Sequence, residues 1–201
     1  MLAGIILAGG QSKRMGKEKA WLPFGPPPGT MLTEVVGVVL EVCDPVVVVA
    51  APDQSLPELP ASIQIVRDPV PEQGPLAALV TGLKALPESS ATVFVCSCDI
   101  PLLQASFISG LKTHLKAGDD FVVPRDRQGR HPLAAIYRRL VLPDAKRLLA
   151  DGKRSLQRLL DEVTGEEVTG EQLQELDPKQ TNLLNVNTLE EYERAVRLYR
   201  R

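Results

Sequence analysis

Residues 3–19 read A-G-I-I-L-A-G-G-Q-S-K-R-M-G-K-E-K, an apolar run that ends in glycines and cations. A short apolar run bounded by glycine is typical of a strand buried on both faces of a parallel sheet. Gly9 and Gly10 lack a Cβ, so their backbone N–H groups can approach phosphate oxygens closely. Arg14 and Lys19 add positive charge that suits phosphate, the first by bidentate contact and the second as a point charge. The stretch therefore predicts a strand and a loop that holds a triphosphate.

Two common phosphate-binding motifs do not match this loop. The P-loop requires G-x-x-x-x-G-K-[ST], but here five residues separate Gly10 from Gly16, and Glu18 stands where the hydroxyl residue would be. The dinucleotide motif G-x-G-x-x-G is also absent, because the first two glycines of the loop are adjacent. A turn whose cations only face solvent is the remaining alternative, and the density of cations disfavours it.

Composition limits the class of protein. The 201-residue chain is 44% hydrophobic and has a net charge of −2, which excludes a disordered chain and a basic nucleic-acid binder. No apolar run approaches the roughly 20 residues of a membrane span, and no basic segment precedes the N-terminal apolar run. We therefore expect a cytoplasmic protein that binds neither nucleic acid nor membranes.

The three cysteines do not form a recognisable framework. Cys96 and Cys98 have C-x-C spacing and Cys43 stands alone, which is unlike a set of disulfide partners. The only histidines, His114 and His131, have no zinc-site spacing to them. We expect reduced cysteines that pack in the interior, rather than a metal site.

Short apolar runs alternate along the chain with stretches that can form helices. The expected strands beyond the first are residues 46–50, 63–66, 92–96 and 121–123, and the expected helices are 31–42, 75–86 and 189–201. This alternation is typical of βαβ units, whose right-handed crossovers place a parallel sheet between helices. The pattern predicts an α/β fold, a Rossmann-like three-layer αβα domain with a mostly parallel central sheet over residues 1–201. The charged stretch 161–179 has no strong period, and we expect a surface excursion there before the last helix.

Two carboxylates follow expected strands. Asp99 lies in C-S-C-D-I-P after the 92–96 run, and Asp68 lies in I-V-R-D-P after the 63–66 run. In an open parallel sheet, such positions face the ligand crevice at the carboxyl ends of the strands. Magnesium usually takes one or two carboxylates together with substrate phosphates, a role that suits Asp99. Either aspartate can instead be a turn residue that precedes a proline.

These motifs resemble those of the molybdenum cofactor guanylyltransferases, the molybdopterin-guanine dinucleotide biosynthesis protein A family of the nucleotidyltransferase superfamily. The likeness includes the opening loop, C-D-I-P, G-P-L-A, and the later H-P-L and N-V-N-T-L-E segments, so it spans nearly the whole chain. It implies the nucleotide-diphospho-sugar transferase type of α/β fold. It also implies a nucleotide-binding half in residues 1–110 and an acceptor-binding half in residues 111–201.

The resemblance implies a role for individual residues of the first half. The implied GTP-binding residues are Leu7, Ala8, Gly9, Gly10, Lys19, Asp68 and Asp99. Arg14, Lys19 and Asp99 are the implied catalytic residues: the two cations would stabilise charge on the phosphates, and Asp99 would hold Mg²⁺ between them.

Later segments are implied to contact the acceptor. His131, Asn185 and Asn187 match family segments on that side, and asparagine offers both donors and acceptors to a polar pterin edge. Arg130 stands before this histidine, where several relatives carry an acidic residue. Thr188 is better explained as the N-cap of the last helix.

The arginines of the last helix can be interpreted in two ways. They could meet acidic groups of an acceptor, or they could be solvated side chains near a helix end, where positive charge is favourable. We favour the second interpretation for all of them, namely Arg194, Arg197, Arg200 and Arg201.

The implied reaction transfers GMP from GTP to the phosphate of molybdenum-bound molybdopterin and releases pyrophosphate. An ionised phosphate nucleophile needs little help from a base, so catalysis would depend on alignment and charge neutralisation. The sequence Ala8-Gly9-Gly10 favours guanine, since related pterin cytidylyltransferases usually carry A-A-G. One alternative is a related enzyme that uses CTP or another acceptor. Another is a non-catalytic module that binds nucleotide and delivers molybdenum cofactor; insertion or delivery proteins are further expected partners.

Overall fold

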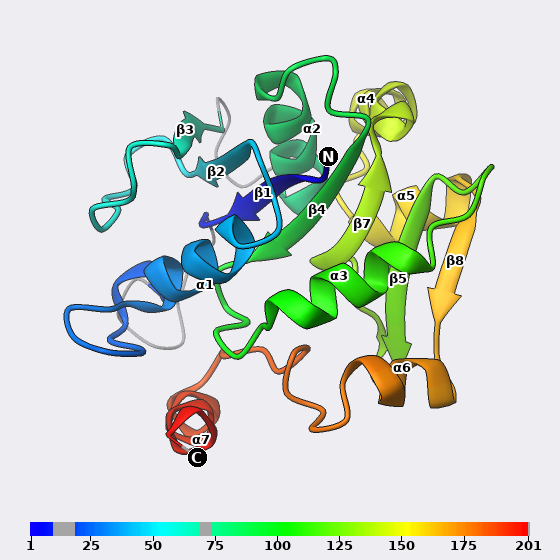
Figure 1. Ribbon diagram of the computed structural model, residues 1–201. Coiled ribbons are helices and arrows are strands. Elements are labelled where there is room, and N and C mark those ends of the chain that lie inside the picture. The colour runs from blue at the N-terminus through cyan, green and yellow to red at the C-terminus, as the bar shows by residue number, and fades with distance from the viewer. Residues whose placement is uncertain (10–18, 69–73, 201) are drawn as a thin grey trace.

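The computed structural model describes residues 1–9, 19–68 and 74–200 of the chain (Figure 1). The strands are β1 (Ala3–Leu7), β2 (Val46–Ala50), β3 (Gln64–Arg67), β4 (Thr92–Ser97), β5 (Phe121–Asp126), β6 (Gly129–Arg130), β7 (Ala134–Arg138) and β8 (Gly165–Val168). The helices are α1 (Met31–Leu40), α2 (Gly74–Ala85), α3 (Ala105–Thr113), α4 (Leu142–Ala150), α5 (Leu156–Glu162), α6 (Gly170–Leu176) and α7 (Leu189–Tyr199). Among the described residues, no helix has the length and apolar character needed to cross a membrane.

One sheet contains all of these strands, in the order β3-β2-β1-β4-β7-β5-β6, with β8 also paired to β5. The pairs β1–β2, β2–β3, β1–β4 and β5–β8 are parallel. Strand β7 runs antiparallel to both of its neighbours, β4 and β5. The mostly parallel sheet predicted from the sequence is confirmed; the reversed strands are β7 inside it and the two-residue β6, which is antiparallel to β5.

Helices cover both faces of the sheet: α1 and α3 lie on one face, and α2, α4 and α5 lie on the other (Figure 1). Successive side chains of a strand point to opposite faces. Along β1, Ile6 packs in the apolar cluster on the α1 side, whereas Ile5 packs in the cluster on the α2 side. Each fully buried side chain of this size contributes roughly 1.5–3 kcal/mol to stability. The two clusters hold three layers together, as predicted.

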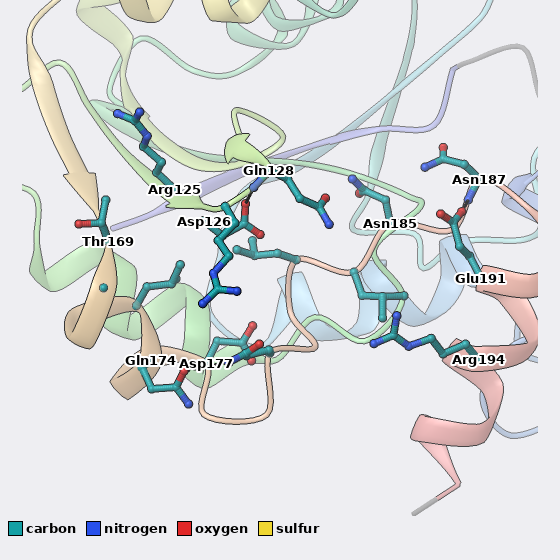
Figure 2. A pocket seen from close by; sticks show the side chains of 16 residues that line it. Arg125, Asp126, Gln128, Thr169, Gln174, Asp177, Asn185, Asn187, Glu191 and Arg194 are labelled. Carbon is teal, nitrogen blue, oxygen red and sulfur yellow. Dashed lines mark hydrogen bonds between the residues drawn. The ribbon is translucent and has the colours of Figure 1, made fainter.

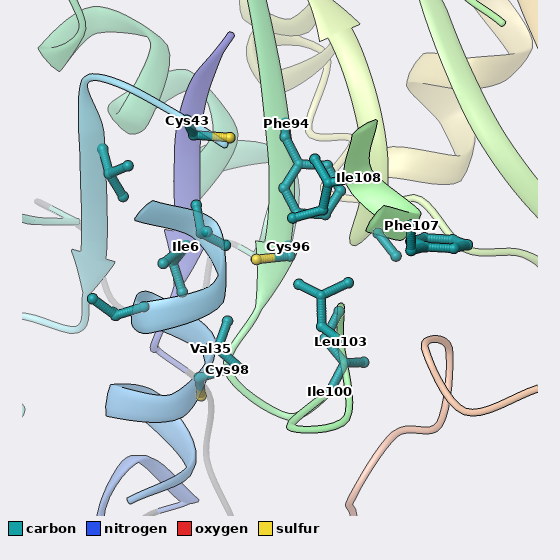
Figure 3. Close-up of a cluster of buried hydrophobic side chains, with 14 of the residues drawn as sticks. Ile6, Val35, Cys43, Phe94, Cys96, Cys98, Ile100, Leu103, Phe107 and Ile108 are labelled. Carbon is teal, nitrogen blue, oxygen red and sulfur yellow. The ribbon is translucent and has the colours of Figure 1, made fainter. Parts of the chain in front are cut away.

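The cysteines belong to the cluster on the α1 side, among Ile6 and Phe94 (Figure 3). Cys43, Cys96 and Cys98 are free and buried. Burial raises the pKa of Cys43 and of Cys98 to about 12, which suppresses the thiolate that metal binding and disulfide exchange require. Their predicted role as buried packing residues is confirmed.

Residues 161–179, expected as a surface excursion, contain β8 and α6, and β8 pairs with β5 in the sheet. Strand β8 has only four residues, G-E-E-V, and it is half-buried at the end of the sheet. Its acidic side chains pair with cations of neighbouring segments: Glu166 with Lys116 at 3.2 Å and Glu167 with Arg125 at 2.7 Å. A strand this short, with charged residues on it, leaves no hydrophobic period to detect.

Helix α7 lies beyond one end of the sheet (Figure 1). Thr188 is its N-cap, as predicted: the Thr188 hydroxyl accepts a hydrogen bond from the Glu191 N–H at 3.2 Å. In return, Glu191 Oε2 accepts from the N–H groups of Thr188 at 3.0 Å and Asn187 at 2.7 Å. The helix packs on a third apolar cluster, which contains Leu22, Phe24, Met31, Val186 and Ala195.

Candidate functional site

Most of the predicted first-half site residues that the structure describes lie where the parallel strands end. The N–H of Ala8 donates to Val49 O at 2.9 Å, and the N–H of Asp68 donates to Ala50 O at 2.9 Å. These bonds extend the parallel ladder one residue beyond β1 and β3. Asp99 lies two residues beyond β4, on the same side of the sheet. We call this part of the molecule, Ala8, Gly9, Asp68 and Asp99, the carboxyl edge.

Lys19, Asp99 and Asn187 meet in space although they are far apart in the sequence. The Lys19 ammonium donates to Asp99 Oδ2 at 3.0 Å and to Asn187 Oδ1 at 2.7 Å. The side chains of Lys19 and Asp99 are 18% and 21% exposed, so the ion pair is partly shielded from solvent yet open to a ligand. Three residues predicted from separate motifs thus form one cluster.

Further hydrogen bonds fix the orientation of this cluster. The hydroxyl of Ser97 donates to Asp99 Oδ1, so both carboxylate oxygens of Asp99 have a donor. The N–H of Val186 donates to the backbone oxygen of Asp99 at 2.8 Å, which ties the 185–187 segment to the turn after β4. The cap of α7 then holds the Asn187 backbone through Glu191. Partners of this kind hold functional side chains in place before a ligand binds.

The start of the glycine loop is also held by a residue that the motifs did not indicate. Gln54 donates from Nε2 to Ala8 O at 2.9 Å and accepts at Oε1 from the Ala51 N–H at 3.1 Å. A Cβ at Gly9 would lie 3.2 Å from the Ala51 nitrogen, so glycine allows this close approach. The remaining predicted loop residues, Gly10 and Arg14, lie outside the residues that the structure describes.

Two other predicted nucleotide-binding residues are placed differently from Asp99. Leu7 is 5% exposed and packs in the core on the α2 side, so contact with a nucleotide would come through its backbone. Asp68 is half-buried at the end of β3, three strands away from β4. At about 4.8 Å per strand, the two aspartates are on the order of 14 Å apart across the sheet. They therefore belong to different parts of one elongated edge.

A groove of about 1080 Å³ opens beside the Lys19–Asp99 pair. It is bounded by the β5–β6 turn, by α6, by the segment that follows α6 and by the first turns of α7 (Figure 2). Both predicted asparagines, Asn185 and Asn187, line it. Because Asn187 also contacts Lys19, the groove and the carboxyl edge share this residue. We call this space the α6–α7 groove.

His131 lies behind the wall of the groove rather than on it. Its Nε2 is 3.0 Å from Oδ1 of Asp126, which does line the groove, but the contact lacks the alignment of a hydrogen bond. Partial burial would raise the pKa of Asp126, but the contacts from His131 and from the N–H groups of Gln128 and Gly129 outweigh it, so this pKa is lowered. His131 is thus placed to hold a lining residue.

The structure allows a test of whether the site suits a divalent cation. The described residues contain no group of three or more His, Cys, Asp or Glu side chains that could hold one. Asp99 alone provides a hard carboxylate at the Lys19 cluster. Magnesium is commonly held by one or two carboxylates when substrate phosphates supply further oxygens. The donor set therefore fits Mg²⁺ that is shared with a phosphate ligand.

Known proteins resemble this chain in sequence. Residues 4–168 match the model of the MobA-like NTP transferase domain. A probable molybdenum cofactor guanylyltransferase of Mycolicibacterium paratuberculosis is 42% identical over 190 residues, which cover 93% of this chain and 91% of the relative.

Solved structures show the same fold. Molybdopterin-guanine dinucleotide biosynthesis protein A of Archaeoglobus fulgidus superposes with a TM-score of 0.75 and 18% identity, covering 98% of each chain. The 2-C-methyl-D-erythritol 4-phosphate cytidylyltransferase of Thermus thermophilus superposes with a TM-score of 0.71 and 14% identity, covering 100% of each chain. At such identities the likeness concerns the fold alone, and the fold is shared by proteins named for different nucleotides.

Proposed function

The chain belongs to the MobA-like NTP transferase family, and on that premise we propose that it transfers GMP from GTP to the phosphate of molybdenum-bound molybdopterin. The products would be molybdopterin guanine dinucleotide and pyrophosphate. The name of the 42% identical relative supports these substrates. The observation that carries the proposal is the Lys19 ammonium, which joins Asp99 at the carboxyl edge to Asn187 in the α6–α7 groove.

The carboxyl edge would bind GTP. The turn after β1, with Gly9 and the predicted residues Gly10 and Arg14, would cradle the phosphates through N–H groups and positive charge. Lys19 lies where it can neutralise charge on a phosphate beside Asp99. Asp68, on the order of 14 Å from Asp99 across the sheet, would contact the nucleoside end rather than the phosphates.

Asp99 would hold Mg²⁺ together with phosphate oxygens. The ion, when bound, supplies positive charge to the reacting phosphates. Ser97 and Lys19 each donate to one carboxylate oxygen of Asp99, so its side chain has a defined orientation before a ligand arrives.

The acceptor would occupy the α6–α7 groove with its phosphate toward Asn187. An oxygen of that phosphate forms a bond to the α-phosphorus of GTP, and the bond between this phosphorus and the α–β bridging oxygen breaks. Pyrophosphate leaves with the bridging oxygen. Since the nucleophile is already ionised, the protein contributes alignment and neutralisation, for which Lys19 and Asn187 are placed at the junction of the two sites.

The decisive test is Asp99→Asn, which keeps the shape of the side chain and removes its charge. Purified protein receives molybdenum-loaded molybdopterin, Mg²⁺ and either GTP or CTP, and pyrophosphate and the dinucleotide are measured. We expect product from GTP with the unaltered protein and a loss of at least about 100-fold in the variant. Asp151→Asn, an exposed aspartate at the end of α4, is the matched control and should retain activity. Near-normal turnover by Asp99→Asn would contradict the assigned role.

The same assay separates the alternatives. Product from CTP rather than GTP would reassign the base and leave the mechanism intact. Tight nucleotide binding, measured by thermal shift, with no pyrophosphate from any nucleotide would instead favour the non-catalytic delivery module.

A further inference from the structure

The α6–α7 groove has balanced formal charge, but its carboxylates are already engaged within the protein. Each acidic residue that lines it accepts hydrogen bonds or an ion-pair contact from neighbouring segments. Asp126 contacts His131 and the Gln128 N–H, Asp177 accepts from Thr181 and twice from Asn182, and Glu191 accepts from Asn187 and Thr188. These carboxylates are therefore oriented toward partners other than Arg127 and Arg194, although they keep their charge.

The arginines of the groove differ in whether they form an ion pair with an acidic residue. Arg125 pairs with Glu167 at 2.7 Å. Arg127 and Arg194 also line the groove, yet neither forms an ion pair with any residue in the described ranges. Two guanidinium groups thus remain without an acidic partner in a concave polar space.

One acidic residue near Arg194 is already engaged elsewhere. Glu191 is three residues earlier on the same helix, a spacing at which Glu and Arg commonly pair. However, Glu191 is turned back to cap α7, where it accepts from Asn187 and Thr188. Figure 2 shows Glu191 directed toward Asn187 and Arg194 extending from α7 toward the groove. The cap therefore leaves the charge of Arg194 available to a ligand.

The next arginine of the helix behaves differently and provides a comparison. Arg197 pairs with Glu193 at 3.9 Å and does not line the groove. The interpretation of a solvated helix end, which the sequence favoured for all of these arginines, suits Arg197. Arg194 is exposed as well, but it also lines the groove. Arginine offers planar, bidentate hydrogen bonding to oxyanions, so its position in the groove indicates an anionic ligand.

We propose that Arg194, with Arg127 from the β5–β6 turn, binds the oxo-metal end of the acceptor and so favours metal-loaded over metal-free acceptor. The inference rests on the proposed function, which fixes the acceptor phosphate at the Lys19–Asn187 end. Arg194 lies six positions after the N-cap Thr188, about 9 Å along the helix axis, so the two ends of the groove meet different parts of the acceptor. The second negative group of such an acceptor is its metal–dithiolene centre with its oxo ligands.

Binding measurements test this independently of turnover. Metal-free and molybdenum-loaded molybdopterin are titrated anaerobically, by calorimetry, into the unaltered protein, Arg194→Gln and the control Arg197→Gln. A charge-assisted hydrogen bond typically contributes enough for a change of about 10- to 100-fold in affinity. We expect Arg194→Gln to weaken binding of the metal-loaded acceptor by that factor, to affect the metal-free acceptor much less, and to leave GTP affinity unchanged. Arg197→Gln should match the unaltered protein.

Each of three other titration results overturns the inference. Equal affinities of Arg194→Gln and unaltered protein for the metal-loaded acceptor would exclude the contact, and an equal loss in Arg197→Gln would indicate general electrostatics. Equal losses for both acceptors would exclude recognition of the metal end. If the titrations give the expected affinities but the unaltered protein forms no dinucleotide, the inference holds and the proposed transfer is wrong. If the unaltered protein forms dinucleotide but the titrations do not give these affinities, the proposed transfer holds and the inference is wrong.

Discussion

At the carboxyl edge, Asp99 and Lys19 are about one-fifth exposed, and the ends of buried parallel strands position the residues around them. In the α6–α7 groove, Arg127 and Arg194 are exposed, and a short turn and a capped helix position them. Buried strands tolerate little displacement because their side chains pack closely on both faces. Exposed turns and helix ends tolerate changes of sequence and conformation more readily. Chemistry common to a family is thus expected at the edge, and discrimination between acceptors in the groove.

The largest expected effect comes from removing the charge that joins the two regions. Lys19→Ala should lower the rate of pyrophosphate release by about 100- to 1000-fold, the usual loss when one preorganised donor to a reacting group is removed. Steady-state assays with saturating GTP and acceptor would measure it. The control is Lys84→Ala, an exposed lysine near the end of α2. A loss of only a few-fold would mean that the edge does not depend on this cation.

A smaller effect should follow when the groove alone is disturbed. Thr188→Ala removes the cap of α7 and should cost about 1 kcal/mol, which lowers the melting temperature by about 2–4 °C for a chain of this size. Because the cap also holds Asn187 and orients Glu191, the KM for the acceptor should rise more than the dissociation constant of GTP.

Thr169 provides the stability control for that variant. It is the N-cap residue of α6, but its side chain makes no capping hydrogen bond, so Thr169→Ala should lower the melting temperature less. If Thr188→Ala weakened GTP and acceptor binding equally, the separation of the two regions would be wrong.

The smallest effect concerns the wall of the groove. The pKa of Asp126 lies below its usual 3.8, so this residue contributes stability above that value, and the contribution is lost as the pH falls through the lowered pKa. His131→Gln should raise the pKa of Asp126 and weaken this acid dependence. NMR titration of the side-chain carboxyl carbon would measure the change, with His114→Gln as the control. An unchanged pKa would show that the backbone N–H groups alone are responsible.

The sequence was most informative for strands that are buried on both faces and for residues that directly follow such strands. Strands β1, β2 and β4 are buried on both faces, so each is a continuous apolar run, and Asp99 could be placed because it follows such a run directly. Strand β8 was missed because it is short and carries charged residues. Helices α3 to α6 were also not predicted, and each has nine residues or fewer.

The groove residues could not be predicted for a different reason. Arg194 and Arg197 have the same residue type on the same helix, and only the direction that each side chain takes distinguishes them. That direction depends on how α7 packs and on the use of Glu191 as a cap. Gln54 was missed because it lies in an irregular proline-containing segment, where no periodic pattern exists.

The shared ammonium of Lys19 has a thermodynamic consequence. A ligand that alters the contact between Lys19 and Asp99 also alters the contact between Lys19 and Asn187, because one ammonium group donates to both side chains. Occupancy of one region then changes the affinity of the other. Linkage requires this change to be reciprocal: the factor by which nucleotide alters the dissociation constant of the acceptor equals the factor by which acceptor alters that of the nucleotide. The order in which the two substrates arrive would therefore leave the stability of the ternary complex unchanged.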